Sequence, residues 1–290
     1  MNQKSSKLPY IGVDIGGSHI TAAHIDPVSL SIIDSSMKRE RVSSMDDAET
    51  IFSSWSSVLS SLIETDGQEH SKIGIAMPGP FDYDKGICLM KGQEKYDALY
   101  GMNVRTILSE RLGIPGSDII FINDAEAFLR GELASGAAAA YDKAIGITLG
   151  TGLGSTSNCN GEVVDMNLAF YPFLDSIAEE YISTRWFLKR YKELTGKEIK
   201  NVEALIDGDD QDIKVAIFKE FGENLALFLN DFIEQEQATV VVIGGNIAKA
   251  WESFIEVVRE NLENKNVVLK QSVMWEDAAL VGAAYSWLQN

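Results

Sequence analysis

The sequence is poor in the residues that crosslink chains or bind zinc. Its 290 residues include two cysteines, Cys88 and Cys159, and three histidines. Two cysteines are too few for a disulfide framework and are typical of proteins from a reducing compartment. With only three histidines beside them, the sequence has no ligand cluster of the zinc type. The composition therefore excludes a secreted disulfide scaffold.

Basic residues are also scarce, with 25 lysines and arginines against 43 aspartates and glutamates and a net charge of −18. Such a chain repels the phosphates of nucleic acids and anionic membranes, so we expect neither as a partner. Long apolar runs are absent, and residues 1–7 lack the apolar core of a signal peptide. We therefore expect a cytoplasmic protein. The hydrophobic content of 45% and the length are those of a folded chain with two domains.

A glycine turn near the start organises the rest of the sequence. Residues 10–13 are an apolar run that predicts a buried strand, and apolar alternation resumes after the turn. Between these runs, Gly16, Gly17 and Ser18 predict a turn whose backbone amides can approach an anionic ligand. Asp14, at the strand end, can hold a magnesium ion directly or through water. Taken alone, the pattern fits an ordinary hairpin equally well.

A second copy of this pattern lies in the other half of the chain. The apolar run at residues 144–149 predicts a strand, and a Gly-Thr-Gly turn follows at residues 150–152. Farther on, the pair Asn160-Gly161 is a strong signal for a two-residue hairpin. One such turn in each half indicates two similar halves that face each other across a cleft. Two turns that bind phosphates suit a nucleoside triphosphate better than either turn alone.

A carboxylate follows another predicted strand. Residues 119–122 are apolar and predict a short buried strand, and Asn123 and Asp124 precede a predicted helix at residues 125–134. The carboxyl end of a parallel strand is where open α/β sheets bind ligands, which favours a functional Asp124. An N-cap at Asp124, worth about 1 kcal/mol of helix stability, explains the position as well. Sequence position alone leaves both interpretations open.

Three more stretches combine a ligand-site interpretation with a structural one. Gly79 lies between two prolines in a rigid loop that either lines a ligand cleft or only ends a strand. Residues 95–103 have the composition of a site for a polyhydroxylated ligand, but a helix start capped by Asn103 is favoured. Gly244 and Gly245 follow a predicted core strand and either let a nucleotide base lie against the backbone or form a tight turn.

Taken in order, six stretches resemble the motifs of the ROK family of sugar kinases, which joins repressors, open reading frames and kinases. They are residues 14–18, 77–80, 123–127, 150–154, 243–246 and 277–284, and the resemblance covers nearly the whole chain. It implies an α/β fold of two similar actin-like (ribonuclease H-like) ATPase domains with a cleft between them. We expect the first domain at residues 1–124, joined by a C-terminal helix at 277–290, and the second at residues 125–276.

The resemblance also implies a role for each candidate residue. Asp124 would be the general base that takes the proton of the attacking sugar hydroxyl, with Asn123 and Gly79 at the sugar, and Asp14 would help to hold Mg²⁺. Such an arrangement suits phosphoryl transfer, which needs mainly positioning and charge stabilisation. By the same resemblance, the residues that would bind ATP are Gly16, Gly17, Ser18, Gly150, Thr151, Gly152, Gly244 and Gly245.

The sequence departs from the family pattern at the sugar site. Many members carry a Glu-x-Gly-His motif and a cysteine-rich zinc segment before a Glu-x-Tyr-x-Ser helix start. Here residues 179–183 keep only the last of these, so Glu179 is the candidate sugar ligand. Residues 161–165 contain no histidine and residues 166–175 no cysteine. We therefore predict that zinc is absent and that the sugar contacts are altered.

The leading prediction is an ATP- and Mg²⁺-dependent kinase that phosphorylates the 6-hydroxyl of glucose, mannose or an N-acetylhexosamine. Its partners would be a small sugar and ATP, and the resemblance allows a homodimer. The main alternative is a sugar-binding sensor or regulator without catalysis, and a third is an ATPase that drives a partner. Family repressors carry a helix-turn-helix segment before the first glycine turn, whereas about a dozen residues precede Asp14 here, which counts against a repressor.

Overall fold

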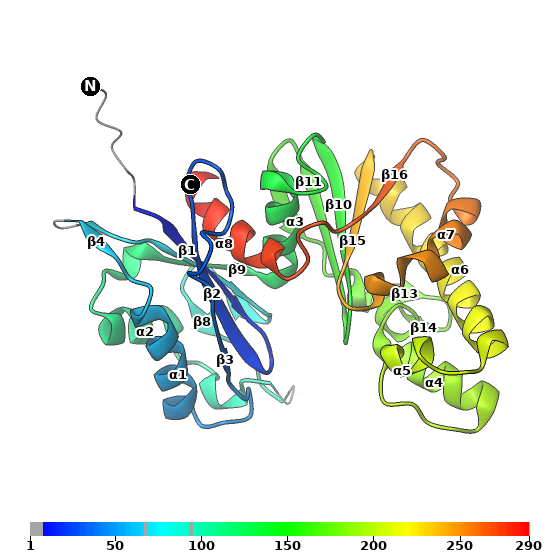
Figure 1. Ribbon diagram of the computed structural model, residues 1–290, viewed down its shortest axis with the longest axis horizontal. Helices are drawn as coiled ribbons and strands as arrows, with labels where there is room; N and C mark the ends of the chain where they lie inside the picture. Colours follow the sequence, from blue (N-terminus) through cyan, green and yellow to red (C-terminus); the bar gives the residue numbers. More distant parts are fainter. Residues whose placement is uncertain (1–7, 67–68, 93–94, 290) are drawn as a thin grey trace. The chain divides into compact units, whose positions relative to one another are not determined.

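The computed structural model describes residues 8–66, 69–92 and 95–289. The chain divides into two compact units, Met1–Ser135 with Glu276–Asn290, and Gly136–Trp275. Each unit contains one five-stranded sheet with helices packed on it (Figure 1).

The sheet of the first unit has the strand order β3-β2-β1-β6-β9. β1 and β2 are antiparallel, as are β2 and β3, whereas β1, β6 and β9 run parallel. The strands of this unit are β1 (Tyr10–Ile15), β2 (His19–Ile25), β3 (Lys38–Arg41), β4 (Thr65–Asp66), β5 (Glu69–His70), β6 (Ile73–Met77), β7 (Phe81–Asp82), β8 (Ile87–Cys88) and β9 (Ile119–Asn123). Its helices are α1 (Ala48–Ser60), α2 (Val104–Leu112), α3 (Asp124–Ser135) and α8 (Asp277–Gln289), with the 3-10 turns η1 (Asp97–Leu99) and η2 (Gly116–Asp118).

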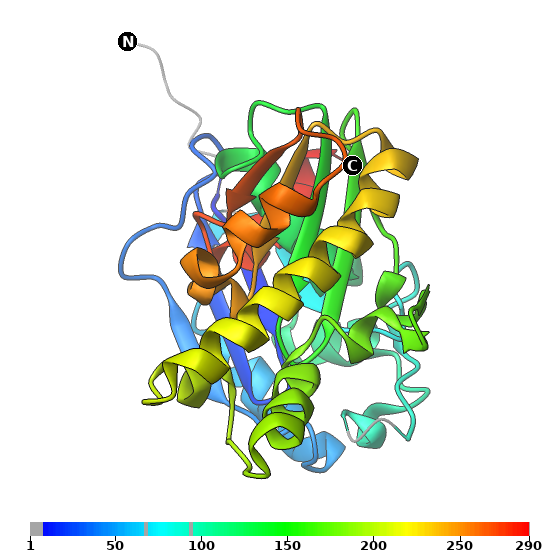
Figure 2. The ribbon, with the colours of Figure 1, turned by 90° about the vertical axis from the view of Figure 1, so that its right-hand side faces the viewer.

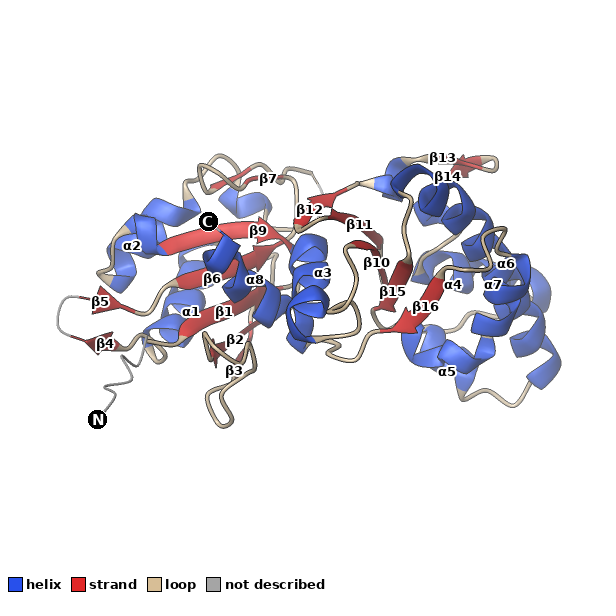
Figure 3. Ribbon diagram, turned by 90° about the horizontal axis from the view of Figure 1, so that it is seen from above, coloured by secondary structure: helices blue, strands red, loops and turns tan. Residues whose placement is uncertain are grey.

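The two faces of this sheet are packed differently because side chains alternate along each strand. From β1, Ile11, Val13 and Ile15 enter a core of large apolar side chains that includes those of α1 and α2. On the other face, Gly12 and Gly74 let α8 come so close that a Cβ on either would lie 2.1 and 2.0 Å from helix carbonyl oxygens. Figure 3 shows α8 lying across these strands. Asp14 lies two residues after Gly12 on the same strand, so its side chain is on the face of the sheet that packs against α8.

The position of α3 differs from the sequence expectation. The predicted boundary after Asp124 assigned this helix to the second domain, whereas the division at Ser135 keeps it in the first unit. The reason is close packing against α8, since a Cβ on Gly131 would lie 2.0 Å from Ala278 O and one on Gly282 1.8 Å from Ala127 O. Glycine at both positions lets the two helix backbones touch.

The second unit repeats the sheet with the order β12-β11-β10-β15-β16. Its strands are β10 (Lys143–Leu149), β11 (Leu153–Cys159), β12 (Glu162–Asp165), β13 (Pro172–Phe173), β14 (Ser176–Ile177), β15 (Val240–Gly244) and β16 (Val268–Gln271). Its helices are α4 (Thr184–Thr195), α5 (Val202–Ile206), α6 (Gln211–Glu236) and α7 (Ile255–Asn261), with η3 (Leu168–Phe170), η4 (Ala178–Glu180) and η5 (Ile247–Ser253). Figure 2 looks onto α6 and α7 in front of this sheet.

The core of the second unit is formed mainly by α6. This helix begins after Asp210, whose side chain accepts a hydrogen bond from Ile213 N. It buries Phe218, Phe221, Phe228 and Phe232 against the apolar face of the sheet. Although α6 has 26 residues, no helix within the described chain is both long and apolar enough to cross a membrane.

The two sheets share one topology, which confirms the expectation of an α/β fold with two similar halves. In each sheet a hairpin is followed by two strands parallel to its first strand. The turns at residues 16–18 and 150–152 connect the equivalent strand pairs β1–β2 and β10–β11. The predicted Asn160-Gly161 hairpin joins β11 and β12, and both of its residues have positive φ, as a tight turn of this kind requires.

Two helical segments of the second unit each consist of two pieces. η5 and α7 are separated at Phe254, whose φ of −134° is not helical. η4 and α4 are separated at Ser183, which has an extended backbone. In both places the apolar spacing continues through the break, because both pieces pack on the same core.

Candidate functional site

The first glycine turn is open on its outer side. Gly16 N donates a hydrogen bond to His19 O over 3.0 Å, which closes the turn between β1 and β2. A Cβ on Gly16 or Gly17 would meet no atom closer than 3.9 Å, and neither residue has positive φ. The fold therefore does not require glycine here, and the bare backbone leaves room for a ligand. The predicted Ser18 lies at the exposed end of the turn, where its hydroxyl contacts the ring of His19.

Asp14 carries a carboxyl group whose pKa the fold strongly perturbs. Its pKa is raised from 3.8 to about 7, first because burial removes hydration and then because Asp124 and Glu276 are nearby acids. Two cations, Arg39 and Lys95, oppose this shift. These five residues are called the Asp14 cluster below. Arg39 is already paired, since its Nη1 lies 2.6 Å from Glu276 Oε2.

The residue that caps helix α3 is Asn123, not Asp124. The side-chain oxygen of Asn123 accepts hydrogen bonds from Ala125 N at 2.8 Å and Glu126 N at 3.3 Å, so Asn123 caps α3. Asp124 is the first residue of the helix. Among the residues that the structure describes, its carboxylate accepts a hydrogen bond only from the adjacent Ala125 N, over 2.9 Å. The capping role proposed as the alternative for Asp124 thus belongs to its neighbour, and the Asp124 carboxylate joins the Asp14 cluster.

A tyrosine that the sequence did not single out holds Asn123 in place. Asn123 Nδ2 donates to Tyr83 Oη over 3.2 Å, and this hydroxyl donates to Met77 O over 3.0 Å. Gly79 lies against the same tyrosine, because a Cβ there would be 3.4 Å from Tyr83 Oη. The structure therefore brings the predicted sugar residues Asn123 and Gly79 together around Tyr83.

The segment at residues 95–103 caps a helix at one end and reaches the first glycine turn at the other. Asn103 caps α2 by accepting a hydrogen bond from Thr106 N over 2.9 Å, as favoured from the sequence. At the other end, Tyr96 is fully buried and its hydroxyl donates to Gly16 O over 2.5 Å. This contact spans 80 positions of the chain, so no local pattern could have revealed that Lys95 and Tyr96 reach the glycine turn.

The second unit brings Glu179 to the other glycine turn. Its Oε2 accepts a hydrogen bond from Leu153 N over 3.0 Å, and its other oxygen pairs with Arg185. A Cβ on Gly152 would lie 2.5 Å from Glu179 Oε2 and would displace the carboxylate, whereas one on Gly150 would meet nothing within 4 Å. The predicted sugar ligand and the predicted nucleotide turn are therefore in direct contact.

The structure explains Gly245 as the glycine of a tight turn, one of the two interpretations that the sequence allowed. It has φ +85°, and a Cβ there would lie 2.4 Å from Leu149 O, at the end of β10. A tight turn against the backbone thus requires glycine at this position. Gly244 is the last residue of β15 and is buried, pairing with Thr148 of β10. Both glycines therefore lie next to the turn at residues 150–152, which follows β10.

Comparison with known proteins identifies the family. The model of the ROK family matches residues 10–165, more than half of the chain. The chain belongs to the ROK family. It is 24% identical to a glucokinase of Thermotoga maritima over 96% of both chains, and 22% identical to an N-acetyl-D-glucosamine kinase of Histophilus somni over 97% of this chain and 99% of the relative.

The solved structures agree on the fold of this ROK family member. A ROK family glucokinase from Streptomyces griseus in complex with glucose and AMPPNP covers 97% of this chain and 100% of its own, with 21% identity and a TM-score of 0.75. A ROK hexokinase from Thermus thermophilus has a TM-score of 0.76. The chain has the actin-like two-domain fold of these enzymes. Together with the curated relatives, they support a sugar kinase.

A magnesium ion fits the donors present in this ROK family member. Among the described residues no group of three or more histidines, cysteines or acids gathers as a metal site. Mg²⁺ needs no such group, because it is usually bound by one or two carboxylates together with waters and substrate phosphates. Asp14 supplies oxygen donors, and its raised pKa shows that its ionised form is destabilised in the folded protein, which a bound cation would offset. The absence of zinc stays a prediction.

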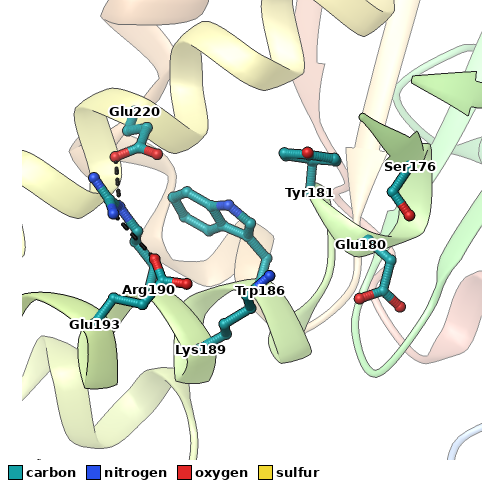
Figure 4. Close-up of a pocket in the computed structure, with 8 residues that line it drawn as sticks. All are labelled: Ser176, Glu180, Tyr181, Trp186, Lys189, Arg190, Glu193 and Glu220. Atoms are coloured by element: carbon teal, nitrogen blue, oxygen red, sulfur yellow. Dashed lines mark hydrogen bonds and ion pairs between the residues drawn. The ribbon is translucent and has the colours of Figure 1, made fainter. Parts of the chain in front are cut away.

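The second unit also has a pocket of about 180 Å³, lined by residues of η4, α4 and α6 among others (Figure 4). Its lining includes Glu180, Trp186 and Lys189. Arg190 in this pocket is held by Glu193 and Glu220, with N–O distances of 3.0 and 2.8 Å. Arg190 is therefore engaged by two glutamates of the pocket itself, and we assign no ligand to this pocket.

Proposed function

We propose that this ROK family protein transfers the γ-phosphoryl group of ATP to the 6-hydroxyl of a hexose, with Asp124 as the general base. The observation that carries the proposal is the position of the Asp124 carboxylate in the Asp14 cluster beside the open glycine turn. Among the described residues, this carboxylate accepts a hydrogen bond only from the adjacent Ala125 N. A carboxylate held at a strand end next to a phosphate-binding turn suits proton removal from an attacking hydroxyl.

In the proposed reaction, the sugar 6-oxygen attacks the γ-phosphorus while its proton passes to Asp124. The new bond joins this oxygen to phosphorus, and the bond from phosphorus to the β–γ bridging oxygen breaks to release ADP. Mg²⁺, held by Asp14 directly or through water, would supply positive charge to the phosphates when bound. Asn123 and Gly79 would orient the sugar from their places around Tyr83.

ATP would be bound by the amides of Gly16, Gly17 and Ser18 in one unit and of Gly150, Thr151 and Gly152 in the other. Open space outside Gly16, Gly17 and Gly150 supports this assignment, because the fold does not need glycine at those three positions. Gly244 and Gly245 would lie near the adenine and ribose. The Streptomyces griseus glucokinase was solved with AMPPNP bound, which is consistent with a nucleoside triphosphate as the donor.

Glucose, mannose and the N-acetylhexosamines are the proposed acceptors. The relatives include a glucokinase and an N-acetyl-D-glucosamine kinase, which supports a hexose without choosing between them. Glu179 is the proposed sugar ligand of the second unit, and its bond to Leu153 N would hold its carboxylate in one orientation. Action in the cytoplasm, a homodimer and the lack of a nucleic-acid partner remain predictions.

A coupled assay of ADP release over a panel of hexoses tests the proposal. We expect release that depends on one or a few sugars and on Mg²⁺, and a loss of at least about 1,000-fold in kcat for Asp124→Asn. Sugar-independent release would favour an ATPase that drives a partner. Sugar binding without any release in a folded protein would favour the sensor or regulator.

A further inference from the structure

Lys95 belongs to the Asp14 cluster but has no role in the reaction proposed above. It is partly buried, and its side chain interacts electrostatically with the carboxylates of both Asp124 and Asp14. Burial lowers the pKa of Lys95, and these two carboxylates oppose the shift. Within the described part of the chain, Lys95 has no hydrogen bond or ion pair, whereas the other cation of the cluster, Arg39, is bound to Glu276.

The backbone next to Lys95 is fixed to the glycine turn by three hydrogen bonds. Tyr96 N donates to Ser44 O over 2.9 Å, and Ser44 N donates to Gly17 O over 3.1 Å. The third is the bond from the Tyr96 hydroxyl to Gly16 O over 2.5 Å. Tyr96 is fully buried against Trp55, with ring centroids 5.5 Å apart. Lys95 therefore starts from a rigid position beside the turn.

The site contains more acids than cations, so a further positive charge that is free to bind a phosphate would be favourable there. The Asp14 cluster contains three acids and two cations, and one of those cations is used by Glu276. A transferring phosphoryl group brings further negative charge next to Asp14 and Asp124. Fixed positive groups aimed at such a group are the main means by which proteins accelerate phosphoryl transfer.

We propose that Lys95 is a catalytic residue whose ammonium group binds the transferring γ-phosphoryl group of the nucleotide, while the negative charges of Asp14 and Asp124 attract it toward the site before the nucleotide arrives. The inference rests on the proposed function for the identity of the transferred group. During transfer the ammonium keeps its protons, donates hydrogen bonds to the phosphoryl oxygens, and follows the group from the β–γ bridging oxygen of ATP to the sugar oxygen.

Nucleotide binding tests this role apart from turnover. Titration calorimetry on the full chain compares AMPPNP with ADP for the wild type, Lys95→Met and Lys95→Arg. Because only AMPPNP carries a γ-phosphoryl group, we expect Lys95→Met to weaken AMPPNP by about tenfold or more and to leave ADP within about twofold. Lys95→Arg, which keeps the charge, should recover part of the AMPPNP affinity.

Lys91→Met is the matched control. Lys91 lies on the same segment but is exposed, with its Nζ 4.7 Å from the centre of the Tyr100 ring. We expect this variant to bind both nucleotides as the wild type does, and to have the wild-type kcat. In the kinase assay, Lys95→Met should lower kcat by about 100-fold or more with little change in the KM of the sugar.

The outcomes separate the two proposals. An unchanged ratio of AMPPNP to ADP affinity in Lys95→Met, with a wild-type circular dichroism spectrum, would overturn the role of Lys95 whether or not a sugar is phosphorylated. Equal losses in Lys95→Met and Lys91→Met would overturn it too. In a third outcome, Lys95→Met loses the preference of the wild type for AMPPNP over ADP, but the wild type releases no ADP with any sugar. This result would contradict the proposed function and support the contact between Lys95 and the γ-phosphoryl group.

Discussion

Replacing Asp14 by asparagine should stabilise the fold while removing activity. The folded protein raises the pKa of this carboxyl group from 3.8 to about 7, so it holds the proton more tightly than the unfolded chain does. The contribution of Asp14 to stability is therefore most favourable at low pH and declines as the pH rises through the interval between these two values. Above it, the folded protein contains an ionised carboxylate that is poorly hydrated and close to Asp124 and Glu276.

The size of the effect follows from the pKa difference of about three units. At about 1.4 kcal/mol per unit, the raised pKa of Asp14 lowers the free energy of unfolding by about 4 kcal/mol at pH 8, where the folded protein contains the ionised group. At pH 5 it lowers this free energy by about 2 kcal/mol, because the unfolded chain ionises while the folded protein keeps the proton. Asparagine has the same shape and no charge. Asp14→Asn should therefore be more stable than the wild type, and its advantage should grow by about 2 kcal/mol between these pH values.

Urea denaturation without Mg²⁺, followed by tryptophan fluorescence, measures this difference. Trp55 is fully buried in the first unit and reports on its unfolding. Asp34→Asn is the matched control, because Asp34 is exposed in the same unit, and it should leave the stability unchanged at both pH values. An Asp14→Asn protein that is less stable than the wild type at pH 8, or whose advantage does not depend on pH, would refute the account of the cluster.

Three further predictions concern the backbone around the site. Gly282→Ala would place a Cβ 1.8 Å from Ala127 O, so it should destabilise the first unit by about 3 kcal/mol or more in chemical denaturation; wild-type stability would contradict the packing described. Gly150→Ala meets no atom within 4 Å, so it should change stability by less than about 1 kcal/mol yet weaken ATP about tenfold in calorimetry, and unchanged ATP affinity would argue against a nucleotide turn. Tyr96→Phe loses the bond to Gly16 O, and we expect a KM for ATP raised about threefold or more with the sugar KM unchanged; equal changes in both would point to a general loss of fold.

The sequence predicts best the elements that are determined by residues close to one another in the chain. Each strand–glycine–strand pattern appears as expected, and the Asn160-Gly161 turn is in place, because turn chemistry and alternation act over a few residues. By contrast, β3 consists of four exposed residues at the edge of its sheet, Lys38–Arg41, and carries no apolar alternation. Nothing in its own sequence predicts a strand.

The site was predictable where a motif marks a strand end and hidden where contacts are distant. Asp14 and Asp124 follow apolar runs and are recognisable from position and family resemblance. Lys95 is not, because its place depends on the bonds of Tyr96 to Ser44 and to Gly16 across the unit. The N-cap, which the sequence allowed at Asp124 as one of two open interpretations, lies at Asn123, since both side chains can accept a helix amide and only the packed structure distinguishes them.

The most direct test of the central claim is the rate of phosphoryl transfer in a single turnover. Enzyme in excess over ATP is mixed with a saturating hexose that the wild type accepts, and sugar phosphate is quantified after rapid quenching. With Asp124 as the base, Asp124→Asn should keep its affinity for the sugar but transfer the phosphoryl group at least about 1,000-fold more slowly. A variant that transfers the phosphoryl group at the wild-type rate would show that Asp124 is not the base.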